Sequence, residues 1–309
     1  MAKRVLLDVD TGIDDALGIL LAVKSRQLDV VGITTVCGNV SQQQATLNTC
    51  KILELAGARH IPVYAGATAP LLRKKFHEHR VHGQDGLGGA LSDLIPAKKP
   101  EEGFAPDYIL ATALMTPGEL TLIMTGPLTN LALALQKFPE LPQYVEEVIF
   151  MGGVVRGPGN VTPVAEYNIY ADPEAARLVL EAGFPKLTQI GLDVTRKALL
   201  TEDHIRQLTD PLLRQYVADS TAAYIDRYEF VNGVRACAMH DPLAVAVAIE
   251  PQLVETQSYS MDVETGSRLC DGQTVCDIQN RLGLQPNVLV AETVDSQAFM
   301  NLFIETLNR

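Results

Sequence analysis

The feature that most constrains the fold is a regular alternation of short apolar runs with longer segments of helical periodicity. The apolar runs are rich in β-branched residues, which is typical of strands that are buried on both faces of a sheet. They occupy residues 5–9, 30–35, 63–65, 120–125, 148–151 and 187–190, and the helical segments occupy residues 14–24, 41–56, 106–115, 127–138 and 173–182. The alternation predicts an α/β fold with an open, mainly parallel sheet flanked by helices.

No linker-like tract divides the 309 residues, so we expect residues 1–309 to form one domain. After Leu253 we expect the domain to finish with a short antiparallel or irregular extension of the sheet. Pro127 and Pro173 are expected in the first turns of their helices, where the missing N–H of proline does no harm.

The charge balance excludes several classes of partner. The 25 basic and 37 acidic side chains give 25 − 37 = −12, which argues against binding to nucleic acid or to an anionic membrane. The first expected strand begins at Arg4 and leaves no room for a signal sequence. Five cysteines without a C-x-x-C pair favour reduced thiols. We therefore expect a cytoplasmic protein.

Polar and flexible residues follow four of the expected strands. Ligands of open parallel sheets bind outside the carboxyl ends of the strands, so these residues should meet in one crevice. Strand alternation would place Asp8 and Asp10 on the same side. The residues concerned are Asp8, Asp10, Asp14, Asp15, Gly38, Asn39, Thr125, Gly126, Met151, Gly152 and Gly153.

The four aspartates between positions 8 and 15 favour a metal site. Carboxylates this close repel one another unless a cation or protons compensate. Asp14 and Asp15 could merely favour a helix N-terminus, but Asp8 and Asp10 would then remain buried without a nearby Lys or Arg. An all-oxygen ligand set suits Ca²⁺ or Mg²⁺ and disfavours zinc.

Residues 6–16, LLDVDTGIDDA, resemble the D-x-D-P-G-x-D-D-A signature of the inosine-uridine preferring nucleoside hydrolases. Thr11 departs from that signature, because the family usually has proline there. The resemblance covers residues 4–250 and implies a Rossmann-like nucleoside hydrolase fold, a homo-oligomer (dimer or tetramer) and hydrolysis of ribonucleosides to base and ribose. The other matching segments are Gly38-Asn39, VHGQDGLGG at 81–89, TGPLTN at 125–130, Met151-Gly152-Gly153, Asn160, EYNIYAD at 166–172 and His240-Asp241-Pro242.

Carried onto this chain, the resemblance implies a Ca²⁺ held by Asp10, Asp15, Asp241 and the backbone carbonyl of Thr125. Asp10 would also accept a proton from the metal-bound water and act as general base. Three carboxylates around one divalent ion suit a neutral diol and would repel a phosphorylated sugar. The resemblance further implies substrate contacts from Asp14, Asn39, Met151, Asn160, Glu166, Asn168 and Asp241.

Departure of the base requires a proton or an equivalent hydrogen bond, a task that suits histidine. His240, beside Asp241, is the expected acid, and His82 in the glycine-flanked loop is the alternative. Tyr224 and Tyr228 are spaced i, i+4 and would share a helix face, which is also a common pattern for core residues. The resemblance implies that this region approaches the base, on which the two rings would stack. Given the resemblance, the absence of tryptophan favours a broad or pyrimidine-tolerant preference, without ranking the bases.

Two other functions fit parts of the pattern. A haloacid-dehalogenase-like phosphohydrolase also opens with a strand and D-x-D, which would make Asp8 a nucleophile. That family has Thr or Val two residues after the second Asp, where this chain has Gly12, and it leaves the other motifs unexplained. A Ca²⁺-dependent nucleoside-binding protein without turnover is the second alternative, against which the presence of both Asp10 and His240 argues.

Overall fold

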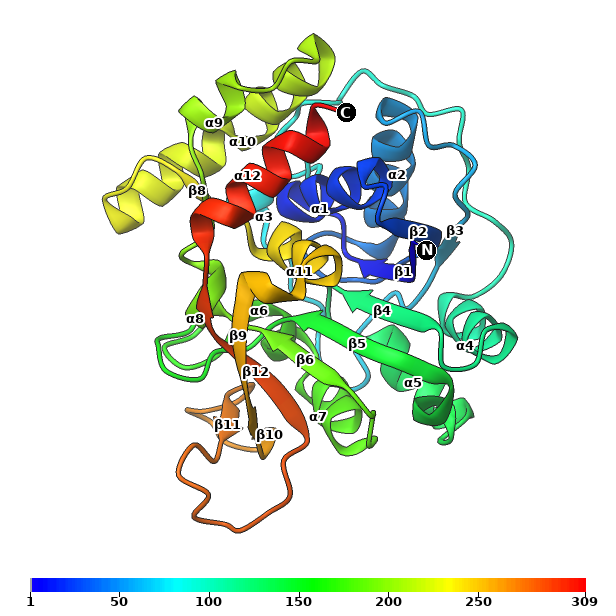
Figure 1. The fold of residues 1–309 in the computed structure, drawn as a ribbon, viewed down its shortest axis with the longest axis vertical. Coiled ribbons are helices and arrows are strands. Elements are labelled where there is room, and N and C mark those ends of the chain that lie inside the picture. Colours follow the sequence, from blue (N-terminus) through cyan, green and yellow to red (C-terminus); the bar gives the residue numbers. More distant parts are fainter. Residues whose placement is uncertain (1) are drawn as a thin grey trace.

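The computed structural model describes residues 2–309 and is built on an eight-stranded sheet (Figure 1). The strand order is β3-β2-β1-β4-β5-β6-β12-β9, in which only β9 pairs antiparallel, with β12. The prediction of an α/β fold with a mainly parallel sheet is confirmed. The strands are β1 (Lys3–Val9), β2 (Leu28–Thr35), β3 (Val63–Ala65), β4 (Leu120–Met124), β5 (Val145–Met151), β6 (Leu187–Ile190), β9 (Val254–Tyr259) and β12 (Val288–Val294).

Helices cover both faces of the sheet and create a separate apolar core on each (Figure 1). In β1, Leu7 and Val9 belong to one core and Leu6 belongs to the other, so the strand reads as a continuous apolar run. One core is covered by α1 (Ile13–Lys24), α2 (Gln42–Leu55), α10 (Pro211–Asn232), α11 (His240–Ile249) and α12 (Ser296–Leu307), and the other by α4 (Ala105–Met115), α5 (Thr129–Lys137) and α7 (Pro173–Glu181).

The segment after Leu253 is more regular than expected. β12 joins the sheet parallel to β6, and β9 forms its antiparallel edge. Between them a hairpin of β10 (Met261–Val263) and β11 (Thr274–Cys276) packs beside α7, at the bottom of Figure 1. The remaining elements are α3 (His79–His82), η1 (Leu141–Tyr144), α6 (Tyr167–Ala171), α8 (Leu192–Thr195), β7 (Leu199–Leu200), α9 (Glu202–Arg206), β8 (Cys237–Ala238) and η2 (Pro251–Leu253).

The two expected first-turn prolines differ in outcome. Pro173 is the first residue of α7, and the Asp172 side chain caps that helix by accepting from the Ala175 backbone N–H. Pro127 lies outside its helix, because α5 begins at Thr129 and the preceding residues form the turn that leaves β4. Among residues 2–309, no helix has both the length and the apolar character that a membrane span requires.

Candidate active site

A tight group of carboxylates lies where α1 and α11 begin. Asp14, Asp15 and Asp241 each offer a carboxylate oxygen, and these oxygens lie within 4.8 Å of one another. All three residues are buried, with exposed fractions of 6%, 1% and 3%. Helices α1 and α11 pack against each other, which brings together two segments more than 200 residues apart in the sequence. Burial, reinforced by neighbouring negative charge, raises the pKa of Asp14 to about 8 and that of Asp241 well above its usual value.

Asp10 is fully buried beside this group. Its Oδ2 accepts a 2.6 Å hydrogen bond from the backbone N–H of Asn39, and its own N–H donates to Asp15 Oδ1 at 3.3 Å. Burial and the charge of Asp15 raise the pKa of Asp10 well above its usual range. Oδ1 of Asp10 and Oδ1 of Asp14 are buried and have no hydrogen-bond donor. Buried anionic oxygens without donors fit a divalent cation that prefers oxygen ligands.

Thr125 touches the same group from the end of β4. Its hydroxyl donates to Asp15 Oδ1 at 2.7 Å, and its backbone carbonyl accepts from Asn168 Nδ2 at 2.6 Å. The carbonyl keeps a second lone pair, so these contacts leave it able to serve as a metal ligand.

Asp8 has different partners from Asp10, because β1 ends at Val9 and strand alternation does not continue beyond it. Its Oδ1 accepts hydrogen bonds from Thr34 Oγ1 at 2.5 Å and Asn130 Nδ2 at 2.7 Å, and its Oδ2 has no partner. Burial raises the pKa of Asp8 to about 7. Asp8 thus connects β1 to β2 and α5. It does not line the cavity, which weighs against its role as a phosphohydrolase nucleophile.

A cavity of about 80 Å³ lies over the carboxylates and brings together most of the predicted residues. Asp10 and Asp15 are buried beside it and do not line it. The predicted residues that line it are Asp14, Asn39, His82, Thr125, Met151, Asn160, Glu166, Asn168, Tyr224, His240 and Asp241. The sequence reasoning missed Glu78, Val81 and Tyr167, which also line it. Tyr167 stands between the predicted residues Glu166 and Asn168. For Glu78 the available signal was the long polar stretch 71–82, LLRKKFHEHRVH, which leads into the glycine-flanked loop.

Glu166 and Asn168 lie at the start of the short helix α6. Glu166 caps α6 by accepting from the backbone N–H groups of Asn168 and Ile169, and it also accepts from Gly153. Asn168 lies in the first turn of α6 and donates to the carbonyls of Thr125 and Met151. Capping of the helix N-terminus thus fixes the Glu166 side chain at the cavity, and the two carbonyl acceptors fix the side chain of Asn168.

Both candidate histidines are held by their Nδ1 atoms, His82 in a buried position and His240 in a half-buried one. His82 Nδ1 accepts from the backbone N–H of Ile13 at 3.1 Å, so the neutral ring carries its proton on Nε2. His240 Nδ1 lies 2.7 Å from Thr195 Oγ1. Burial lowers the pKa of His82 to about 4 and that of His240 to about 3. Near pH 7 both rings are neutral hydrogen-bonding groups.

A second cavity, of about 470 Å³, shares Val81, Asn160, Tyr224 and His240 with the first. Tyr228 lines only this outer cavity. The rings of Tyr224 and Tyr228 meet edge to face with centroids 6.3 Å apart, so the expected shared helix face is confirmed. Ligand pockets usually measure about 300–1,000 Å³, which the two adjoining cavities reach together.

Comparisons with known proteins agree with this arrangement. The model of the family described as inosine-uridine preferring nucleoside hydrolase matches residues 5–301. The pyrimidine-specific ribonucleoside hydrolase RihA of Citrobacter koseri is 38% identical over 99% of this chain and 98% of the relative. A plant nucleoside hydrolase structure has a TM-score of 0.92 and 34% identity, covering 100% of this chain and 99% of its own. A purine-preferring ribonucleoside hydrolase from Gardnerella vaginalis has the same TM-score and identity, covering 99% and 98%. The chain is therefore a nucleoside hydrolase of the inosine-uridine preferring family.

Proposed function

We propose that this protein hydrolyses the N-glycosidic bond of ribonucleosides, with Ca²⁺ as cofactor, and releases free base and ribose. The observation that carries the proposal is the buried carboxylate group at a cavity that also contains two neutral histidines. Asp10, Asp15, Asp241 and the carbonyl of Thr125 would hold the ion. When bound, Ca²⁺ would offset the carboxylate charge and make a water molecule more acidic.

Asp10 is the proposed general base for the attacking water. One of its oxygens is fixed by the Asn39 N–H, which orients the carboxylate, and the other has no hydrogen-bond partner and is free to accept a proton. Burial and the charge of Asp15 raise the pKa of this carboxyl in the metal-free site, and a bound cation would oppose that shift and favour the ionised form that a base requires.

The inner cavity is proposed to hold the ribose. Asp14, Asn39, Asn160, Glu166, Asn168 and Asp241 supply its polar lining, and Met151 supplies apolar surface. Anionic side chains stabilise the positive charge that develops on the sugar ring as the glycosidic bond breaks. A neutral ribonucleoside fits this field, whereas a phosphorylated one is repelled by it.

The base is proposed to extend into the outer cavity, where Tyr224 and Tyr228 offer aromatic surface. His240 lines both cavities and would donate a hydrogen bond to the departing base, with His82 as the alternative donor through its Nε2–H. RihA is named as pyrimidine-specific and the Gardnerella vaginalis enzyme as purine-preferring. Relatives of similar identity differ in base, so the preference of this chain depends on its own outer-cavity residues.

We further propose that residues 1–309 act as one domain, as a homo-oligomer in the cytoplasm. One sheet with a core on each face supports the first point. The five free cysteines are consistent with a reducing compartment.

The test is a reducing-sugar assay with inosine, uridine and cytidine, before and after chelation and again after Ca²⁺ is restored. We expect free ribose from at least one nucleoside, loss of release on chelation and recovery with Ca²⁺. Binding of nucleosides without ribose release would instead support the non-catalytic binding protein. Full activity after verified removal of metal would reject the cofactor.

A further inference from the structure

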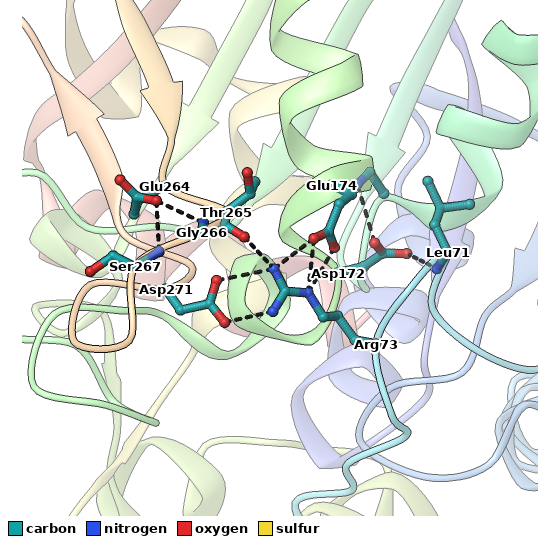
Figure 2. Close-up of polar contacts among 10 residues, drawn as sticks. Leu71, Arg73, Asp172, Glu174, Glu264, Thr265, Gly266, Ser267 and Asp271 are labelled. Carbon is teal, nitrogen blue, oxygen red and sulfur yellow. Dashed lines mark hydrogen bonds and ion pairs between the residues drawn. The ribbon is translucent and has the colours of Figure 1, made fainter.

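Arg73 connects three segments that are far apart in the sequence (Figure 2). Its Nε lies 2.9 Å from both carboxylate oxygens of Glu174 in α7. Its Nη1 donates to Asp271 at 2.7 Å, and its Nη2 donates to the carbonyl of Thr265 at 2.8 Å. Thr265 and Asp271 belong to the loop that joins β10 to β11. One guanidinium therefore ties the loop after β3 to both α7 and the hairpin.

The geometry differs from that of an ordinary surface ion pair. The side chains of Arg73, Glu174 and Asp271 are only 29%, 19% and 25% exposed, and both carboxylates are bound through two oxygens. Such forked contacts fix direction as well as distance. On the hairpin, Glu264 accepts from the N–H groups of Gly266 and Ser267, which holds the turn that presents the Thr265 carbonyl (Figure 2).

The same stretch of chain is attached at a second point close by. The backbone N–H of Leu71 donates to Asp172 Oδ2 at 2.8 Å, and this oxygen also accepts from Thr129 Oγ1 (Figure 2 shows the Leu71 contact). Asp172 caps α7, so its position is set by the helix. Residues 71–73 are therefore held by the scaffold on the α7 side of the sheet.

From this anchor the chain runs directly to the candidate active site. The carbonyl of Phe76 accepts from the Tyr167 hydroxyl at 2.7 Å, and the N–H of Glu78 donates to the carbonyl of Asn39 at 3.1 Å. Glu78, Val81 and His82 then line the inner cavity. The second half of the segment 74–82 thus supplies part of the cavity lining, and we call the segment the wall; Arg73 directly precedes it.

The hairpin also contacts a second loop, the one that follows β5. Thr274 Oγ1 accepts from the N–H of Val154 at 3.0 Å and lies 2.7 Å from the carbonyl of Val154, to which it donates. The preceding residue, Gly153, donates to Glu166 in the cavity. The hairpin is accordingly a common support for two loops that border the cavity, although none of its residues lines the cavity itself.

We propose that Arg73 is a positioning residue that latches residues 74–82 against the cavity, with the β10–β11 hairpin as the fixed point. The inference rests on the proposed function only in taking this cavity as the nucleoside site. Without the latch, the wall exchanges between open and closed forms, and apparent affinity falls in proportion to the closed fraction. Bound substrate still selects the closed form, so turnover at saturation changes little.

The test compares Arg73→Met with Arg177→Met. Arg177 lies in α7 and also joins this helix to the hairpin, through Asp262 of β10, but none of its ion pairs or hydrogen bonds reaches the loop at 71–82. We expect Arg73→Met to raise KM by about tenfold with kcat within about threefold of the wild type, as a closed fraction near one tenth implies. Arg177→Met should keep both constants. Arg73→Lys, which keeps the charge and loses the fork, should fall between the two.

Amide hydrogen exchange provides a readout that does not depend on activity. The N–H groups of Val81, His82 and Gly83 are hydrogen-bonded within α3, and their exchange should accelerate in Arg73→Met and not in Arg177→Met. Asp271→Asn added to Arg73→Met should have little further effect, because the two residues act as one unit.

Unchanged amide exchange and KM in Arg73→Met would overturn the latch. Equal changes of KM and exchange in Arg73→Met and Arg177→Met would also overturn it, because they would indicate a general weakening of α7 and the hairpin. If the wild type releases no ribose, the proposed function fails. The exchange comparison then still decides whether Arg73 holds the wall.

Discussion

At the scale of single residues, Asp8 and Asp10 illustrate how position changes the chemistry of one side-chain type. Asp8 is held by hydroxyl and amide donors from β2 and α5, whereas Asp10 is held by a backbone N–H and lies beside other acids. The Asp8 side chain therefore connects β1 to β2 and α5. Asp10 combines a fixed oxygen with an unpartnered one, which is the arrangement that a general base requires.

The first prediction concerns Asp10→Asn, which keeps the shape and an acceptor for the Asn39 N–H but removes the proton acceptor. We expect kcat to fall by about 10²- to 10⁴-fold with a smaller change in KM. Steady-state kinetics with the most active nucleoside will measure the split. The matched control is Asp8→Asn, which should alter thermal stability and leave kcat of the folded enzyme near the wild-type value. A loss confined to KM in Asp10→Asn would count against Asp10 as base.

The second prediction separates a leaving-group role of His240 from a structural one. His240→Ala should slow hydrolysis of inosine by about 10²- to 10⁴-fold, since the departing base loses its hydrogen-bond donor. A riboside of p-nitrophenol, whose anion leaves without help, should be nearly unaffected. Equal losses on both substrates would assign His240 to the metal or the fold. A selective loss in His82→Ala alone would move the role to His82.

At the scale of elements, the loops at the strand ends are packed against the carboxylates with no spare room. A Cβ on Gly38, which follows β2, would lie 1.9 Å from Asp10 Oδ2. A contact that short is impossible, so any larger residue must displace the Asp10 side chain or the loop. Gly38 is thus required by the close approach of the Asp10 side chain to the backbone at position 38, which explains its place in the motif.

The third prediction follows from this contact. Gly38→Ala should weaken Ca²⁺ binding by at least about tenfold, because one or more ligands must move by a sizeable part of an ångström. Isothermal titration calorimetry of the metal-free protein with Ca²⁺ will measure the dissociation constant. The control is Gly266→Ala, where the nearest atom to an added Cβ is 3.7 Å away. Equal affinity in the two variants would remove Asp10 from the metal site.

The positions of most strands and helices could be predicted from the sequence. Apolar runs located the six strands from β1 to β6, and the helices α1, α2, α4 and α7 begin within one residue of their expected starts. α5 was placed too early because proline signals the vicinity of a helix start and not its register. The turn of helix at Tyr167–Ala171 was missed because five residues give too little periodicity to detect.

The carboxylates were found because several acids in one short segment have no ordinary structural explanation. The Arg73 network could not be found in this way. Its partners Glu174 and Asp271 come from other segments, and surface arginines and acids are common in any sequence. Only the packing of α7 against the hairpin makes them neighbours.

At the scale of the whole molecule, the acidic side chains differ in how much they destabilise the folded state. The chain carries a net charge of −12, and most acids are solvated, but Asp8, Asp10, Asp14, Asp15 and Asp241 are buried. Like charges in a low-dielectric interior oppose folding unless protons or a cation neutralise them. The stability of the native state should therefore depend on both pH and metal.

The fourth prediction is the sign of that dependence. The pKa is about 7 for Asp8 and about 8 for Asp14, against about 3.9 for an unfolded aspartate. Below about pH 6.5 this effect is opposed by His82 and His240, whose lowered pKa values make the unfolded chain bind more protons at those sites. Between about pH 6.5 and 8 the metal-free native protein binds more protons than the unfolded chain, so its free energy of unfolding falls as pH rises. The slope can reach about 1.4 kcal/mol per pH unit for each group.

Urea unfolding at pH 6.5, 7, 7.5 and 8, with chelator or with excess Ca²⁺, will measure this slope. Ca²⁺ binds the ionised carboxylates, so it should flatten the dependence and stabilise the protein at pH 8 by about 2.7 kcal/mol when present at 100 times its Kd. The proposed site would be contradicted if the free energy of unfolding of the metal-free protein rises over this pH range. It would also be contradicted if excess Ca²⁺ leaves the free energy of unfolding unchanged.

The packing of α1 against α11 also has a consequence for synthesis. It unites Asp14 and Asp15 with Asp241, so the carboxylate group is complete only after residue 241 has left the ribosome. At about 5–20 residues per second, the first acids wait roughly 10 to 45 s for the last one. An incomplete nascent chain lacks one of the proposed ligands and should bind the cation weakly. Cation capture would thus act as a late checkpoint, favouring chains that have been translated through α11 over truncated ones.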